Sequence, residues 1–179
     1  MKSYSQVGQD IWVLSLFPKG YKGYFLDLGC GDPVHFNNTK LLEEHGWDGR
    51  AVDIFDFKNQ WMRRKAVFIQ ENALNIKNVL HRFDVNNIID YLSIDVDTLH
   101  NNYRVLRNFI EAGYDFKALT IEHNAYLGKQ FDEFERQPQR EYLHGLGKNY
   151  DLIRPDVCPE GTTDIFEDWW INTKYINSI

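Results

Sequence analysis

Acidic side chains lie at the ends of several short apolar runs in this sequence, where they could bind hydroxyl groups, an amine or a cation. Five such runs are bounded by turn residues, and the carboxylates that they hold or precede are Asp27, Asp53, Glu71, Asp95 and Glu122. If the runs are parallel strands, their carboxyl ends share one edge of a sheet, where open α/β folds bind ligands. The alternative for any one of these residues is that it caps the helix that follows.

A glycine turn follows the first run. The segment Gly29-Cys30-Gly31 lets a ligand approach the backbone closely. The third glycine of a dinucleotide fingerprint is replaced by Val34, and no lysine follows at the spacing of a phosphate loop. The pattern therefore favours a ligand with a ribose and an adenine but no phosphate. Asp53 could accept the ribose hydroxyls, and Asn72 could bond an adenine edge.

Strands must alternate with helices to bring these residues together. Helical spacing of apolar residues predicts helices over about residues 5–17, capped by Ser5, and 99–112. The apolar runs predict strands over residues 24–28, 50–54, 67–70, 91–95 and 118–122, and the last strand holds Trp169 and Trp170. This order predicts an α/β fold in one domain, residues 1–179, with a mostly parallel sheet and helices on both faces.

Several segments together carry a resemblance to a known family. They are Ser5–Asp10, Asp27–Gly31, the Asn38-Thr39 pair, Gly46–Gly49 and Tyr91–Asp97. In order and spacing they resemble the FkbM-type family of class I S-adenosylmethionine-dependent methyltransferases, although Thr98 stands where a glycine commonly follows. The resemblance implies a Rossmann-like methyltransferase fold with a central sheet of about seven strands. It also implies transfer of a methyl group to a hydroxyl, often on a sugar.

The resemblance also implies a set of cofactor-binding residues at the strand ends and in the N-terminal segment. They are Gln6, Asp27, Gly29, Gly31, Asp53, Ile54, Asn72, Ala73 and Asp95. Gln6 belongs to the opening helix that would cover S-adenosylmethionine, and the alternative is that this helix presents an ordinary exposed face.

Methyl transfer to a hydroxyl requires a group that accepts the proton. His123 is a candidate base because its unperturbed pKa lies near neutrality, and Asp95 and Asp97 are further catalytic candidates. Asp95, Glu122 and Asn124 could hold Mg²⁺, and they resemble the carboxylate sites of metal-dependent O-methyltransferases. The alternatives are that Asp95 holds the cofactor's amino group, that Asp97 caps a helix, and that His123 is a packing residue.

The acceptor would meet residues from the last third of the chain. The polar segment 125–149 holds Arg140 and His144, and loops at strand ends carry specificity. Near the C-terminus, Asp168 and Trp169 could bond and stack on a sugar ring. The alternative is that the tryptophan fills the core.

Composition limits the classes of partner. The 179 residues include 26 acidic and 20 basic side chains, a formal charge of -6, which argues against nucleic-acid binding, although Arg63-Arg64-Lys65 could touch one anion. Two cysteines without a metal-site spacing favour a reducing, cytoplasmic location. Membrane spans and a secretory signal are not expected. We therefore expect an S-adenosylmethionine-dependent O-methyltransferase of a sugar or glycan. The alternatives are a nucleic-acid or protein methyltransferase, or a non-catalytic cofactor-binding module.

Overall fold

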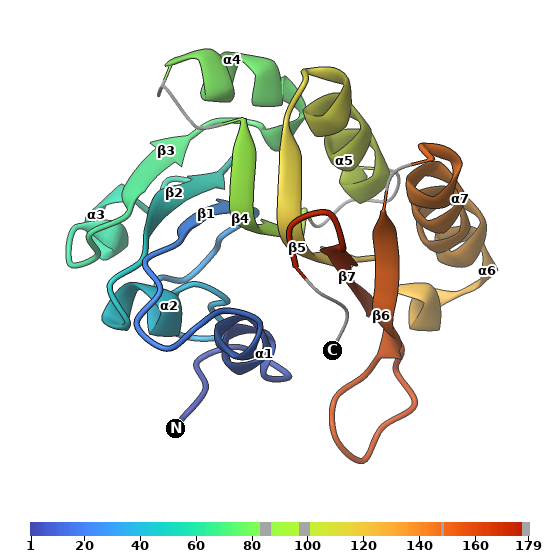
Figure 1. Ribbon diagram of the computed structural model, residues 1–179, viewed down its shortest axis with the longest axis horizontal. Coiled ribbons are helices and arrows are strands. Elements are labelled where there is room, and N and C mark those ends of the chain that lie inside the picture. The colour runs from blue at the N-terminus through green and yellow to red at the C-terminus, as the bar shows by residue number, and fades with distance from the viewer. Residues whose placement is uncertain (83–86, 97–100, 148, 177–179) are drawn as a thin grey trace.

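A seven-stranded sheet runs through the molecule in the order β3-β2-β1-β4-β5-β7-β6 (Figure 1). The computed structural model describes residues 1–82, 87–96, 101–147 and 149–176. The strands are β1 (Tyr24–Leu28), β2 (Asp48–Asp53), β3 (Val67–Gln70), β4 (Ile88–Ile94), β5 (Asp115–Glu122), β6 (Tyr150–Val157) and β7 (Glu167–Asn172). Strands β1 to β5 pair in parallel, whereas β7 is antiparallel to β5 and β6. The expected mostly parallel sheet of about seven strands is confirmed.

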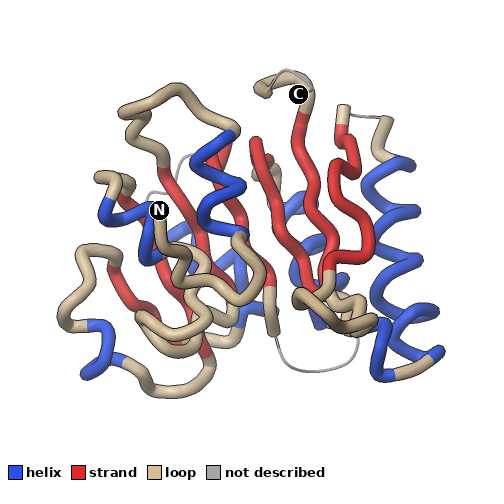
Figure 2. The backbone as a smooth tube through the Cα atoms, turned by 90° about the horizontal axis from the view of Figure 1, so that it is seen from below, coloured by secondary structure: helices blue, strands red, loops and turns tan. Residues whose placement is uncertain are grey.

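Helices cover both faces of the sheet, as Figures 1 and 2 show. On one face lie α1 (Gln9–Ser15), α2 (Lys40–Glu44) and α3 (Lys58–Trp61), which contribute Trp12, Leu42 and Trp61 to one apolar core. On the other lie α4 (Ile76–Arg82), α5 (Asn101–Glu111) and α7 (Gln137–Gly145), with Val79 and Leu106 in a second core. Shorter turns complete the chain: η1 (Ala73–Asn75), η2 (Ala125–Leu127), α6 (Lys129–Phe131) and η3 (Asp132–Arg136).

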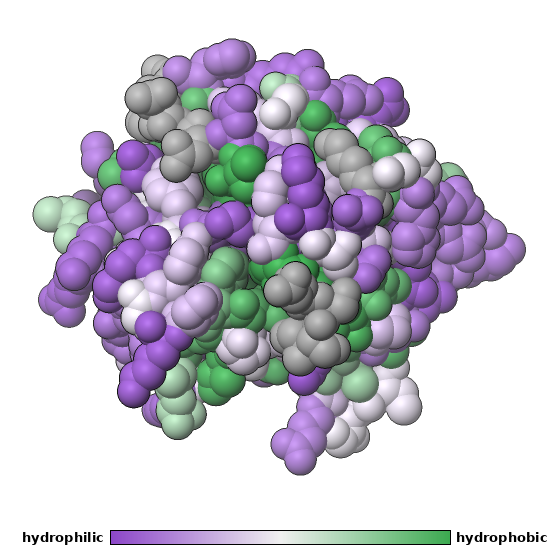
Figure 3. Space-filling view, in the orientation of Figure 1, coloured by the Kyte–Doolittle hydropathy of each residue, from purple (hydrophilic) through white to green (hydrophobic). Residues whose placement is uncertain are grey.

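Successive side chains along each strand point to opposite faces of the sheet, and this separates the two cores. On β1, Phe25 belongs to the core under α1 to α3, and Leu26 belongs to the core under α4, α5 and α7. Trp169 and Trp170 of β7 divide in the same way. The central strands are therefore apolar on both faces, which is why they read as continuous apolar runs. At the surface, Figure 3 shows hydrophilic side chains over most of one face and apolar atoms gathered near its middle.

The opening helix is shorter than the sequence predicts. It begins at Gln9 rather than near Ser5, because Gly8 has the left-handed φ of 88° and interrupts the helix there. The Ser5 hydroxyl instead donates a hydrogen bond of 2.8 Å to Asp10 Oδ1. The later helix begins, as described, at Asn101, and the expected positions 97–100 lie outside the described residues. Across the described residues, every helix is too short or too polar to span a bilayer.

Candidate functional site

The glycine turn lies at the point where the sheet order reverses. From β1 the chain builds β2 and β3 on one side, and then β4 and β5 on the other. Gly29, with φ of 84°, passes so close to β4 that a Cβ atom would lie 1.6 Å from the Asp95 carbonyl oxygen. Gly31, with φ of 50°, has open space where its Cβ would stand. The turn therefore packs tightly against one strand and leaves its backbone open to a ligand at Gly31.

Asp53 at the end of β2 is fixed beside this turn. Its Oδ2 accepts the Gly31 N–H and its Oδ1 accepts the Phe55 N–H, each at 2.9 Å. A carboxylate oxygen has more than one acceptor site, so both oxygens can also receive hydroxyl hydrogens. The neighbouring Ile54 is apolar yet 57% exposed. At the end of β3, Asn72 Oδ1 accepts the Leu74 N–H at 2.9 Å, and Ala73 is buried behind it.

Asp27 belongs to a buried hydrogen-bond network next to the glycine turn. It is buried and accepts a hydrogen bond of 3.1 Å from Thr39 Oγ1, and burial raises its pKa to about 6. Thr39 also accepts from the Arg64 guanidinium, which donates to the Pro33 carbonyl and lies 3.1 Å from Glu43 Oε2. Arg64 is therefore a buried support of the loop rather than an exposed group for an anion. Sequence reasoning missed this network because its members are far apart along the chain.

Three carboxyl groups form a row across the neighbouring strands β4, β5 and β7: those of Asp95, Glu122 and Glu167. Ile94 pairs with Ile121, which sets Asp95 beside Glu122, and Glu122 pairs with Glu167. The Glu122 and Asp95 side chains share a hydrogen bond, and burial together with the Asp95 charge raises the pKa of Glu122. Burial also raises the pKa of Glu167 to about 8, although Trp169 and Gln9 donate hydrogen bonds to it. Burial in the row therefore favours the neutral form of both glutamates.

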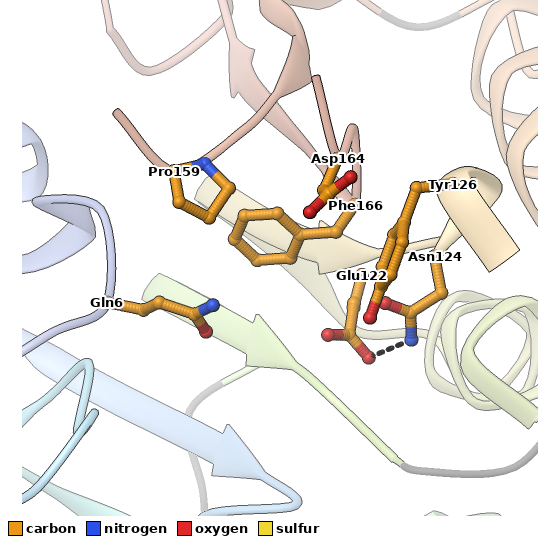
Figure 4. A pocket seen from close by; sticks show the side chains of 7 residues that line it. All are labelled: Gln6, Glu122, Asn124, Tyr126, Pro159, Asp164 and Phe166. Atoms are coloured by element: carbon orange, nitrogen blue, oxygen red, sulfur yellow. Dashed lines mark hydrogen bonds between the residues drawn. The ribbon is translucent and has the colours of Figure 1, made fainter. Parts of the chain in front are cut away.

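A pocket of about 130 Å³ opens beside Glu122 (Figure 4). One wall is polar, because Asn124 Nδ2 donates a hydrogen bond of 2.6 Å to Glu122 Oε2. Three parts of the chain build the pocket: the segment before α1, the end of β5 with η2, and the loop between β6 and β7. The lining residues are Gln6, Glu122, Asn124, Tyr126, Pro159, Asp164 and Phe166. Tyr126 lies in the segment 125–149 that was expected to meet the acceptor, whereas sequence reasoning missed Pro159 and Asp164, since loop residues have no periodicity to place them.

The structure brings together the three residues expected to hold a cation. Asp95 and Glu122 share a hydrogen bond, and Asn124 contacts Glu122. As placed, Asn124 offers Glu122 its amide hydrogens, and a metal would instead require an oxygen. Asp97, the other carboxylate predicted nearby, lies outside the described residues.

His123 points to the opposite face of the sheet from Glu122. Its fully buried ring accepts the Ala125 N–H at Nδ1, and its Nε2 lies 3.5 Å from Asp168 Oδ1 and 4.0 Å from Asp156 Oδ1. Neighbouring strand residues face opposite sides, so the structure does not bring His123 to the carboxyl row. Within the described residues, His123, Asp156 and Asp168 could hold a metal by spacing alone. Arg140, however, already binds both carboxylates.

The four residues predicted to meet the acceptor do not line this pocket. Arg140 binds Asp168 through two hydrogen bonds of 2.7 Å. Burial would raise the pKa of Asp168, but hydrogen bonds from Arg140 and His123 lower it to about 2. Trp169 is buried against Trp12, with ring centroids 4.8 Å apart, and the exposed His144 lies 5.2 Å from the Trp170 ring. Arg140 and Asp168 therefore form an ion pair with each other, whereas Trp169 packs in the core and His144 packs on Trp170.

Solved structures share this architecture. A Clostridium thermocellum protein provisionally named an rRNA methylase is 14% identical, with a TM-score of 0.63 over 96% of this chain and 98% of its own. An rRNA methylase from Streptococcus thermophilus is 12% identical, with a TM-score of 0.59 over 91% and 93%. An O-methyltransferase from Bacillus cereus in complex with S-adenosylhomocysteine is 12% identical, with a TM-score of 0.60 over 92% and 80%.

These likenesses define the fold of the chain. It is the Rossmann-like fold of class I S-adenosylmethionine-dependent methyltransferases, as the sequence predicts. No protein-family model and no curated protein matches the sequence. The narrower resemblance to the FkbM-type family therefore stays a prediction.

Proposed function

We propose that this chain is an S-adenosylmethionine-dependent O-methyltransferase of the FkbM-like type, acting in the cytoplasm on a hydroxyl of a small polyhydroxylated acceptor such as a sugar. One observation carries the proposal. The glycine turn, Asp53 and the Asp95–Glu122 pair lie along one edge of the sheet, at the point where its strand order reverses. The Bacillus cereus structure, which has the same fold and is named an O-methyltransferase, supports it.

The residues around the turn fit the cofactor. The backbone is open at Gly31, the Asp53 carboxylate can accept ribose hydroxyls, and Ile54 offers an apolar surface for a base. Gln6 lines the pocket and lies before α1 rather than on a helix. Asp27 would act indirectly, from the buried hydrogen-bond network next to the turn. The remaining proposed contacts are Gly29, Asn72, Ala73 and Asp95. When bound, S-adenosylmethionine supplies a methyl group on a positively charged sulfur.

The chain's own residues would handle the proton of the acceptor. The Asp95 and Glu122 side chains share a hydrogen bond, and burial together with the Asp95 charge raises the pKa of Glu122. Asp95 can then take the proton that the acceptor hydroxyl releases, while Glu122 stays neutral. A divalent cation held by Asp95, Glu122 and Asn124 stays a secondary part of this proposal, and it would require the Asn124 amide to turn its oxygen toward Glu122, where the amide nitrogen now lies.

RNA is a second candidate acceptor, because two of the compared structures are named rRNA methylases. The formal charge of -6 weighs against it, since binding to RNA depends on neutralising phosphates. A protein acceptor or a non-catalytic role has no such supporting observation.

Calorimetry with S-adenosylmethionine and S-adenosylhomocysteine tests the cofactor site. We expect the wild type to bind both, and Asp53→Ala to raise Kd by at least about tenfold, because a hydrogen bond to a charged group contributes roughly 1.5–3 kcal/mol. The control is Asp56→Ala, since Asp56 is exposed just beyond the same strand. Absence of binding by the wild type, or an unchanged Kd in Asp53→Ala, would contradict the proposal.

A further inference from the structure

The pocket beside Glu122 is acidic as well as polar. Its lining includes the carboxyl groups of Glu122 and Asp164, and among the described residues none that lines it is basic. Asp164 is exposed on its loop, and its side chain lines the same pocket as Glu122. A phosphate or carboxylate entering this space would meet negative charge without a compensating cation.

The volume of the pocket restricts which part of an acceptor can enter it. At about 130 Å³, the pocket is close to the roughly 150 Å³ cavity that accepts one benzene ring. It can therefore hold one ring-sized end group of an acceptor, and the rest must extend outward.

Two aromatic rings, those of Tyr126 and Phe166, also line the pocket. Figure 4 shows the Asp164 carboxylate, the Glu122 carboxyl and the Tyr126 ring turned toward a common space, with Phe166 beneath Asp164. Tyr126 is 48% exposed, so its ring is available for contact. A carboxylate beside aromatic faces is a favourable environment for an ammonium group.

We propose that the acceptor is an amino-polyol, such as an amino sugar, whose ammonium binds Asp164 and Tyr126 while a nearby hydroxyl faces the end of the pocket where Glu122 meets Asp95. This inference rests on the proposed function and names its substrate class. The ammonium nitrogen has no lone pair and cannot be methylated while it is paired with Asp164. The hydroxyl oxygen forms the new C–O bond, its proton passes to Asp95, and the electron pair of the broken C–S bond stays on sulfur.

A matched set of acceptors tests the proposal. Glucosamine carries the ammonium, N-acetylglucosamine replaces it with a neutral amide, and glucose 6-phosphate carries an anion. Labelled-methyl transfer from S-adenosylmethionine is measured for each, with S-adenosylhomocysteine affinity measured separately. We expect glucosamine to be preferred at least about tenfold, with the methyl group on oxygen.

Variants assign that preference to the pocket. Asp164→Asn keeps the side-chain shape, and we expect it to abolish the preference for the amine without changing S-adenosylhomocysteine affinity. Glu160→Gln, an exposed change in the same loop outside the pocket lining, should leave the preference intact.

The outcomes separate this inference from the function on which it rests. If the wild type binds no S-adenosylhomocysteine, the proposed function fails. If it binds the cofactor product but favours N-acetylglucosamine or the phosphate, or if Asp164→Asn keeps the preference, only the present inference is overturned. Methylation on nitrogen would overturn it as well.

Discussion

At the residue scale, a single step along a strand decides which side chains can act together. Glu122 and His123 are neighbours in sequence, yet Glu122 joins Asp95 and the pocket while His123 faces Asp168. Sequence alone places both residues at the end of β5. Their separation follows from the alternation of side chains across a sheet, so the carboxyl pair is the stronger candidate for proton transfer.

The two roles can be distinguished by conservative substitutions. Asp95→Asn removes the carboxylate that accepts the proton, and we expect the methyl-transfer rate to fall about 100-fold, the low end of general acid–base contributions. His123→Gln should keep the rate within about threefold and lower Tm, because the ring is buried among structural partners. Initial rates per folded protein and thermal unfolding measure both effects, and the reverse pattern would restore His123 as the base.

At the element scale, one ion-paired group joins α7 to β6 and β7. Arg140 on α7 binds Asp168 of β7 and Asp156 of β6. We expect Arg140→Met to lower the unfolding free energy by about 3 kcal/mol, because it leaves the buried Asp168 without its cation. Urea denaturation measures the change. Arg107→Met, which breaks the exposed Arg107–Glu111 pair, should leave stability unchanged.

The stability that the Arg140–Asp168 pair contributes has a defined pH dependence. The pKa of Asp168 is lowered from 3.8 to about 2, so its contribution is complete above about pH 4 and is lost as pH falls toward 2. Over that pH range, the free energy of unfolding should therefore fall less in Arg140→Met than in the wild type. An equal stability of wild type and variant at pH 7 would contradict the structural role of this ion pair.

The elements differ in how far sequence could define them. Strands β1, β2, β4 and β5 are largely buried, so their apolar runs predicted them, and the order of the strands predicted that Asp95 and Glu122 lie at one edge of the sheet. Strand β6 was missed because Asp151, Arg154 and Pro155 interrupt its pattern at the sheet edge. The loop between β6 and β7 was missed for a related reason: Asp164 is placed by tertiary packing and has no periodic signal.

At the scale of the whole molecule, the fold alone does not choose between a sugar and RNA. The compared structures include both rRNA methylases and an O-methyltransferase at similar TM-scores. Charge does discriminate, because RNA binding requires that basic groups release counterions from phosphates. This chain carries six more acidic than basic side chains, and the described part of the pocket lining has no basic residue.

Salt-dependent binding therefore provides the test of acceptor class. We expect an rRNA hairpin to bind the wild type no more tightly than about 100 µM at physiological salt, the weak limit of non-specific association. Fluorescence anisotropy at 50 and 200 mM salt, with S-adenosylhomocysteine present, measures this. Glucosamine binding should change little over the same range, because a single charged contact at most is involved. Micromolar RNA affinity that falls steeply with salt would show a phosphate-binding surface and favour RNA as the acceptor.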